Sequence, residues 1–414
     1  MADLLWSRVA LLALALTAAH SALEAQEAAP SSSEATTPIH APRSRGAHPR
    51  DPLEDRAAPT LQPPKADALG QQRIQRLSLW FENDAFAAVD RHYTNGAKLA
   101  WQVFCPEFLE PFTADVDIPG LRGRAQDLSV WIGQNMYSPE NLDEELLIPD
   151  DRPYGGWLYL GVGMTRTNLS IDFEENLECQ PDALAREVLY QEFIALELGL
   201  VGNSSGADKT QIEIHRLTNS DPPEGWRNQL KSEIGFQFKY ACKWLLPLWP
   251  GKAAEEARWQ VDVLPHAVLE AGTIYGHVGG GGTLRVGWNT HRHFGPTQRI
   301  GGGLDLLGAL DAGRWQSAFR CYGFARLETR VVWRNIFVDG NTFRSPVERL
   351  SVNGIVERVS IDREPVVADA EFGFVFELPW VQLSYATVVR TKEFETQEGL
   401  TRFGAVQLSV ALDW

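Results

Sequence analysis

Apolar and polar residues alternate with a period of two along most of the chain after residue 74. The last segment is the clearest example, because five apolar residues alternate there with four polar or small ones. The apolar set is Val406, Leu408, Val410, Leu412 and Trp414. Strict alternation is typical of a β-strand with one apolar face. The pattern therefore predicts a final strand that ends in an aromatic residue.

Similar alternation along the rest of this region predicts twelve strands in all. They lie at 74–82, 93–104, 127–135, 156–167, 187–201, 231–243, 257–270, 281–288, 315–338, 356–378, 379–391 and 404–414. An even number of antiparallel strands is expected of a single-chain bacterial outer-membrane barrel, and such barrels usually end in an aromatic residue. A soluble β-sandwich is the alternative. We predict an all-β, twelve-stranded antiparallel transmembrane β-barrel.

The N-terminal region favours export and weakens the β-sandwich alternative. Residues 9–19 form an apolar run of 11 residues, too short to cross a bilayer as a helix, and Leu23-Glu24-Ala25 resembles a cleavage site. Residues 1–25 therefore read as a signal peptide. Residues 26–73 are rich in Ala, Pro, Ser and charge, which predicts a disordered linker. The barrel is expected to occupy residues 74–414.

The net charge argues against a nucleic-acid partner, and the cysteine spacing argues against a zinc or redox site. The 414 residues include 54 acidic and 38 basic ones, a net charge of −16, which argues against nucleic acid because phosphate contacts need a basic surface. No two of the four cysteines show a C-x-x-C spacing, so a zinc or redox site is not expected. An oxidising periplasm allows disulfides with three possible pairings, and we interpret the cysteines as structural: Cys105, Cys179, Cys242 and Cys321.

Strand parity predicts which loops face the cell exterior. If the chain enters from the periplasm, the connections after odd-numbered strands are extracellular. Three of these loops carry unusual polar sequences, at residues 82–96, 151–157 and 202–229. They are expected to meet at one rim, facing the outer leaflet. The alternation places Asp84 and Thr94 on the inward-facing parity.

Ester hydrolysis is one chemistry that such a rim could support. It needs a base and a group that stabilises the oxyanion. His215 is the histidine of the third loop and lies in an amphipathic stretch, although a lone histidine is more often a packing or surface residue. Asn83 and Asp84 offer the hard oxygen ligands that suit Ca²⁺, or they simply begin a turn. Arg152 could meet a phosphate or form a surface ion pair.

Two glycine-rich segments resemble catalytic motifs and are discounted. Residues 202–206 fit G-x-S-x-G, but a nucleophile elbow belongs in an α/β sheet, so a glycine-rich loop is the better interpretation. Residues 279–282 resemble a phosphate loop without the Gly-Lys-Ser/Thr that should follow, so we predict a hairpin turn there.

Three blocks of residues together resemble the outer-membrane lipid A 3-O-deacylase family. The blocks are Glu82-Asn83-Asp84 with residues 90–96, then residues 153–161, then Gly199, Gly202, Gly206, Gln211, His215 and residues 225–230. The resemblance covers about residues 74–414. It implies a barrel enzyme that removes the 3′-linked acyloxyacyl group of lipid A in a Ca²⁺-dependent manner. It also implies a site between the barrel wall and an extracellular helix at roughly residues 205–217.

The resemblance assigns roles to matching positions. His215 would activate water, while Asn83, Asp84 and Thr94 would shape the site and the calcium position. Arg152 would help to hold the oxyanion or a lipid A phosphate, and it joins Tyr154 and Trp226 as the expected substrate-binding residues. Some members have a glutamate six residues after the histidine, where this chain has Asp221, so the metal set is Asp84, Asn83 and Asp221. The substrate is lipopolysaccharide in the outer membrane, and the protein is expected to be a monomer.

Two other functions are kept as alternatives. One is a non-catalytic barrel, a pore or a structural protein, although inward residues such as Trp80, Lys98 and Gln102 should fill a narrow lumen and make a wide channel unfavourable. The other is a barrel phospholipase with a serine nucleophile, for which Ser204 and Ser205 are the nearby candidates.

Overall fold

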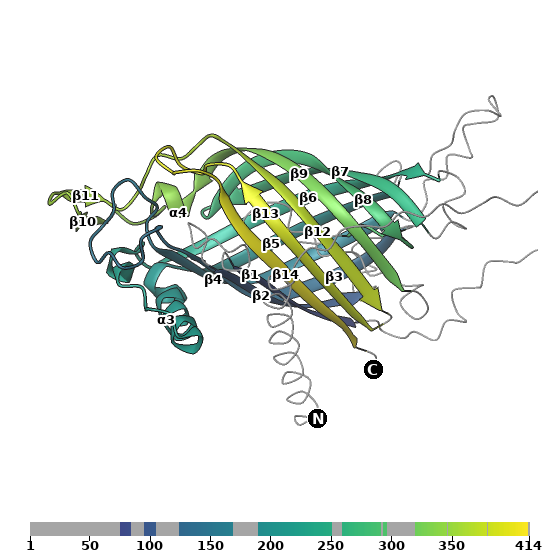
Figure 1. Ribbon diagram of the computed structural model, residues 1–414, viewed down its shortest axis with the longest axis horizontal. Coiled ribbons are helices and arrows are strands. Elements are labelled where there is room, and N and C mark those ends of the chain that lie inside the picture. Colours follow the sequence, from purple (N-terminus) through teal and green to yellow (C-terminus); the bar gives the residue numbers. More distant parts are fainter. Residues whose placement is uncertain are drawn as a thin grey trace, which may run out of the picture. The chain divides into compact units, whose positions relative to one another are not determined.

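The computed structural model describes residues 75–83, 95–104, 124–168, 189–250, 259–290, 293–295, 319–345, 347–378 and 380–412. Within these residues a closed antiparallel barrel forms in which each strand pairs with the next and β14 pairs back with β1 (Figure 1). The barrel strands are β1 (Gln75–Asn83), β2 (Asn95–Phe104), β3 (Arg124–Tyr137), β4 (Gly155–Asn168), β5 (Leu189–Val201), β6 (Glu233–Trp249), β7 (Trp259–Gly272), β8 (Tyr275–Trp288), β9 (Arg320–Asn335), β12 (Val366–Leu378), β13 (Val381–Arg390) and β14 (Thr401–Leu412). The predicted fold class is confirmed. The predicted signal peptide and linker lie outside the described residues.

Two of the predicted segments are corrected. Residues 356–378 are not one strand, because a small hairpin of β10 (Glu348–Leu350) and β11 (Val356–Arg358) comes before β12. Residues 279–282 are not a hairpin turn, because they pair with β7 on one side and with β9 on the other inside β8. A Cβ on Gly281 would overlap the carbonyl oxygen of Leu327, so close strand contact accounts for glycine there.

In the described part of the chain, short helices lie in two connections at one end of the barrel, here called the loop end. The β5–β6 connection holds η5 (Gly202–Ser205), α3 (Ala207–Thr218) and η6 (Gly225–Asn228). The β9–β12 connection holds α4 (Ile336–Asp339) and the β10–β11 hairpin. None of the helices in the described part of the chain is long and apolar enough to cross a bilayer.

The outer wall of the barrel is apolar. On β4, β5 and β6 the outward positions carry large exposed side chains such as Leu160, Leu198 and Ile234, each more than 60% exposed. Residues between them in sequence, such as Tyr159 and Glu197, are buried in the interior. A wall that exposes aliphatic and aromatic side chains on every side is what hydrocarbon surroundings require.

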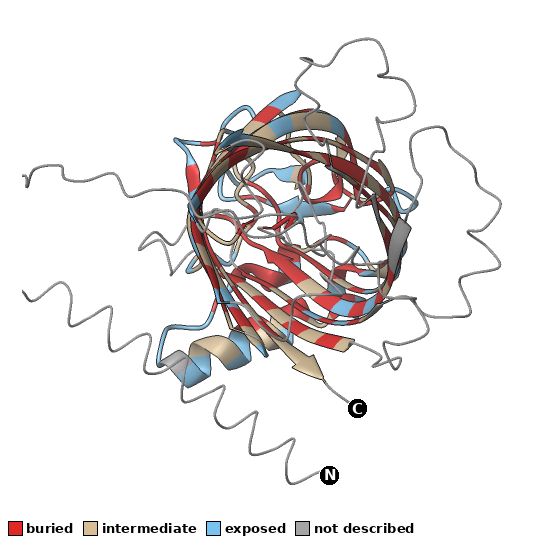
Figure 2. Cartoon of the chain, turned by 90° about the vertical axis from the view of Figure 1, so that its right-hand side faces the viewer, coloured by how far each residue is buried: buried red, intermediate tan, exposed pale blue. Residues whose placement is uncertain are grey.

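Buried residues alternate along the strands of the barrel (Figure 2), and many of those that face the lumen are polar or charged. The predicted inward residues Trp80, Lys98 and Gln102 are each 2% exposed, and the Lys98 ammonium lies 4.9 Å from the centre of the Trp80 ring. Asp369 accepts hydrogen bonds from Arg330 at 2.6 Å and from Arg390 at 2.8 Å. Paired charges of this kind link neighbouring strands on the lumen side of the wall.

An apolar cluster closes the interior at the loop end. The Phe337 ring of α4 stacks on Tyr137 at 4.1 Å, and the hydroxyl groups of Tyr137 and Tyr275 are 2.5 Å apart. The β3–β4 connection is tied to the β10–β11 hairpin, because the Leu147 amide donates to the Leu350 carbonyl at 3.2 Å. The loops therefore cap the barrel on the side where the candidate residues lie.

The cysteines of the described part of the chain are free thiols, Cys242 in β6 and Cys321 in β9. Cys105 and Cys179 lie outside the described residues, so the disulfide interpretation stays a prediction for them.

Replacing Asp369 with alanine should strongly destabilise the barrel. The change leaves two buried arginines without their shared carboxylate, and breaking a buried charge pair costs about 3–5 kcal/mol. The measurement is thermal unfolding in detergent, followed by the heat-dependent shift of the folded barrel in gel electrophoresis. The control is Asp143→Ala, an exposed position where the change should stay within about 0.5 kcal/mol. Equal stability of the two variants would contradict a stabilising lumen network.

Candidate active site on the outer wall

A row of directly paired residues crosses the outer wall at the loop end. Asn83 of β1 pairs with Asn95 of β2, Asn95 with Met136 of β3, and Met136 with Gly156 of β4. Successive residues in a strand point to opposite faces. The neighbouring Trp157 points inward, since its ring meets Tyr275 of β8 across the lumen. The paired row therefore faces outward, toward the surroundings of the barrel.

Helix α3 is held against this wall at Gly156. A Cβ at this position would overlap both the Ser205 hydroxyl and the Ala207 side chain, so only glycine lets the start of α3 come so close. Gln134 of β3 adds a hydrogen bond, donating from Nε2 to the Ser205 carbonyl at 2.8 Å. Figure 1 shows α3 beside the loop end of β4. The loop helix predicted at roughly residues 205–217 is thus present as α3.

Tyr154 and Trp226, both predicted to bind substrate, meet beneath α3. Their rings lie 4.9 Å apart, and the Trp226 indole donates to Gln211 of α3 at 2.6 Å. They form a buried cluster with Met136 and Ala207. Burial raises the pKa of the Tyr154 hydroxyl, so it stays protonated. These contacts hold α3 in position, and substrate contact by either ring stays a prediction.

His215 lies in the last turn of α3 and is half-buried. Its Nδ1 is 2.5 Å from the main-chain carbonyl oxygen of Asp221. The chain returns to this point because Asn219 ends the helix in a left-handed conformation, with φ of 57°, and the Ser220 amide donates to the His215 carbonyl at 2.9 Å. A carbonyl can only accept, so Nδ1 carries the proton and Nε2 of the neutral ring carries the lone pair. This is the tautomer of a histidine base.

The predicted metal residues are only partly within the described chain. Asn83 ends β1 on the outward-facing row, while Asp84 and Thr94, with the prediction that they point inward, lie outside the described residues. Asp221 is exposed and meets His215 through its carbonyl. No group of three or more His, Cys, Asp or Glu in the described ranges could hold a metal ion. The amide and carboxylate oxygens of the predicted set do fit Ca²⁺ by their chemistry.

Arg152 lies in the interior, away from the surface of the wall. It is 1% exposed, its Nη2 donates to Glu393 at 2.7 Å, and its guanidinium lies over the Tyr137 and Phe394 rings at 5.3 and 5.5 Å. Its described contacts join the β3–β4 and β13–β14 connections and do not include α3. A role in binding phosphate stays a prediction.

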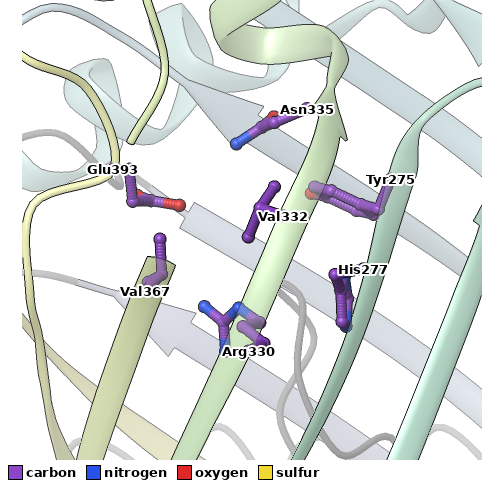
Figure 3. A pocket seen from close by; sticks show the side chains of 7 residues that line it. All are labelled: Tyr275, His277, Arg330, Val332, Asn335, Val367 and Glu393. Atoms are coloured by element: carbon purple, nitrogen blue, oxygen red, sulfur yellow. The ribbon is translucent and has the colours of Figure 1, made fainter. Parts of the chain in front are cut away.

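A pocket beside Glu393 also lies in the interior (Figure 3). It is lined by Tyr275, His277, Arg330, Val332, Asn335, Val367 and Glu393. Its volume of about 20 Å³ has room for roughly one water molecule and none for a lipid head group. This pocket is therefore too small to be a lipid site.

Sequence reasoning did not single out Asn95, which lies in the outward-facing row, or Gln211, which bonds to Trp226. Both lie in the motif blocks, but their contacts depend on long-range packing. Asn95 could have been found from strand register, because it lies opposite Asn83 in the first predicted hairpin. Gln211 is one helical turn before His215, so the two share a helix face.

A closed barrel with an apolar outer wall and a site on that wall defines an outer-membrane β-barrel protein. The family model described as outer membrane protein LpxR matches residues 56–179 and 184–412, and the chain belongs to this family. Among solved structures, LpxR from Salmonella typhimurium is similar in fold, with a TM-score of 0.56 and 18% identity over 81% of this chain and 99% of that chain.

More distant likenesses add nothing to the fold assignment. The β domain of the Bordetella autotransporter BrkA has a TM-score of 0.35 and 7% identity, covering 82% of this chain and 98% of that chain. The translocator domain of the autotransporter NalP from Neisseria meningitidis has a TM-score of 0.33 and 7% identity, covering 83% of this chain and 90% of that one. No curated protein sequence matches the chain closely enough to count as a relative.

Replacing Gly156 with alanine should displace α3 while the barrel stays closed. The new Cβ overlaps side chains at the start of α3, so the helix must move away from the wall. Limited proteolysis should cut residues 207–218 faster, with the thermal unfolding of the barrel unchanged. Gly282→Ala is the control, because the nearest atom to its Cβ would be 4.0 Å away. Equal cleavage in both variants would show that α3 does not depend on this close approach.

The ion pair between Arg152 and Glu393 predicts a dependence of stability on pH. Burial alone would raise the pKa of Glu393, but the Arg152 and Arg390 guanidiniums outweigh burial and hold it below its ordinary 4.5. Because the folded pKa is the lower one, the carboxylate stabilises the protein above about pH 4.5 and loses this effect as the pH falls through the lowered value. Wild type should therefore unfold at a higher temperature than Glu393→Gln at neutral pH, and the difference should shrink in acid. A difference independent of pH would refute the ion-pair account.

Proposed function

We propose that the protein is a carboxylic ester hydrolase that removes the 3′-linked acyloxyacyl group of lipid A. We further propose that it acts as a monomer with its site facing the cell exterior. Membership of the LpxR outer-membrane protein family supports the substrate class. The observation that carries the proposal is the hydrogen bond of 2.5 Å between His215 Nδ1 and the Asp221 carbonyl, on a helix that lies against the outer wall. A lipid in the surrounding leaflet can approach this wall without entering the barrel.

In the proposed mechanism His215 acts as the general base. The Asp221 carbonyl holds the proton on Nδ1, so Nε2 can take a proton from water as that water attacks the ester carbonyl. As the bond between the acyl carbon and the sugar oxygen breaks, the same nitrogen can return the proton to that oxygen, which leaves as a hydroxyl. The Asp221 carbonyl also stabilises the imidazolium that forms between these two transfers, because its oxygen faces the protonated Nδ1.

Asn83, Asp84 and Asp221 are the residues that would hold Ca²⁺, with Thr94 shaping the site beside them. Their amide and carboxylate oxygens are the ligand type that Ca²⁺ prefers. When bound, Ca²⁺ would polarise the ester carbonyl and offset the negative charge that develops on its oxygen.

Burial supports positioning roles for three of the predicted substrate-binding residues. Tyr154 and Trp226 keep α3 on the wall, and Arg152 fixes the β3–β4 connection that carries Tyr154. In this proposal they place His215 without touching the lipid. The Arg152 side chain lies in the interior and is paired with Glu393 at 2.7 Å, so in this proposal it holds the connection and does not contact the lipid.

The two alternative functions receive less support. The Ser205 hydroxyl is buried and donates to the Gly202 carbonyl at 2.6 Å, which stabilises the turn before α3 and does not prepare a nucleophile. A pore would need an open lumen, whereas the described lumen holds buried ion pairs such as Arg285–Asp262 and Arg326–Glu371.

The proposal is tested by weighing lipid A extracted from an outer membrane that contains the protein. Wild type should release the 3′-linked acyloxyacyl group, and His215→Ala should lower the rate by at least about 100-fold, because a general base contributes this much or more. Chelation of Ca²⁺ should abolish release by wild type, and added Ca²⁺ should restore it. Mass spectrometry of the lipid A gives the readout.

The matched control is Arg216→Ala, the next residue on α3, whose side chain is exposed and paired with Glu213. This variant should keep wild-type activity. Lipid A that is unchanged by a folded and inserted wild-type barrel would rule out the proposed substrate. Loss of activity in a Ser204→Ala, Ser205→Ala double variant, with α3 still in place, would favour the serine mechanism.

A further inference from the structure

Asn95 is a buried polar residue whose capacity for hydrogen bonds is not fully used. It is 1% exposed, and its Oδ1 has no hydrogen-bond partner among the described residues. A buried acceptor with no partner lowers stability, and most buried polar groups in folded proteins are paired. An apolar residue of similar size would cost less at this position. The sequence therefore places a hydrogen-bonding group here at the expense of stability.

The position of Asn95 links this group to the candidate site. It lies between Asn83 on β1 and Met136 on β3 in the outward-facing row, one strand spacing of about 4.8 Å from each. Met136 belongs to the cluster that packs against α3, the helix that carries His215. Asn95 thus lies between the strand that ends at Asn83 and the part of the wall that α3 covers.

We propose that Asn95 is a further binding residue of this site, whose Oδ1 accepts a hydrogen bond from an O–H group beside the scissile ester. The inference rests on the proposed ester hydrolysis and adds a residue to it. Two donors have the required chemistry, the attacking water and a sugar hydroxyl next to the ester. An acceptor for the water acts in the transition state, whereas an acceptor for a sugar hydroxyl acts mainly in binding.

The test uses two variants of the same size as asparagine. Asn95→Leu removes all hydrogen bonding, and Asn95→Asp keeps an acceptor at the same place. Asn95→Leu should lower kcat/KM by about tenfold, the effect of losing one hydrogen bond, while its unfolding temperature stays equal or rises. Asn95→Asp should keep kcat/KM within about threefold of wild type. A fall in kcat identifies the water as the donor, and a rise in KM identifies the sugar hydroxyl.

The matched control is Asn135→Leu. Asn135 is buried one strand away, faces the lumen and accepts from the Tyr159 hydroxyl at 3.5 Å. This variant should lower the unfolding temperature and keep kcat/KM, the opposite of the result expected for Asn95→Leu. A purely structural role of Asn95 would make the two variants behave alike and would overturn the inference.

Three other outcomes would also overturn it. Unchanged kcat and KM in Asn95→Leu would show that the amide binds nothing in the reaction. Equal losses in the leucine and aspartate variants would exclude an acceptor role. A higher Ca²⁺ requirement, with normal kcat and KM at saturating Ca²⁺, would make Asn95 a metal ligand. If wild type releases no acyl group in the same assay, the proposed function fails, and this inference fails with it.

Discussion

The structure depends on one constraint, that every backbone N–H and C=O in a wall facing hydrocarbon must find its partner inside the protein. The antiparallel pairing of β1 with β14, from Gln75 opposite Leu412 to Asn83 opposite Gly404, meets this constraint by removing the last free edge. Closure then divides the side chains into two populations. Outward positions must be apolar, and the polar residues that alternate with them have only one another to pair with in the lumen.

This division explains why the candidate site lies outside the barrel. The described lumen holds many paired charges, such as Asp369 between two arginines, and these ion pairs stabilise the barrel. The outer wall is uniform except where the strands end at the loop end. There Gly156 lets α3 come into contact, and the turn after α3 brings a carbonyl to His215. A rigid barrel thus supplies one half of the site, and a loop supplies the other.

The period-two pattern allowed the strands to be predicted because alternation is local and the lumen is polar. The prediction was wrong where alternation does not reflect a barrel strand and where glycines replace the alternating side chains. Residues 356–378 alternate although the first part forms a hairpin beyond the barrel, and residues 279–282 look like a turn because glycine replaces side chains between close strands. The contacts within the candidate site were harder to predict from the sequence than the strands. Nothing in the local sequence says that Tyr154 and Trp226 are buried beneath a helix or that Arg152 pairs with Glu393, which is 241 residues away.

The two halves of the site are held with unequal strength. The wall residues Asn83 and Asn95 belong to strands with continuous backbone pairing, so their separation is fixed by the sheet. His215 depends on a few described contacts of α3 with the wall, namely the approach at Gly156, the hydrogen bond from Gln134 and a small buried cluster. Elements with few buried contacts move at lower cost than the barrel does. The distance between His215 and the wall is therefore more open to change than the spacing of the strands.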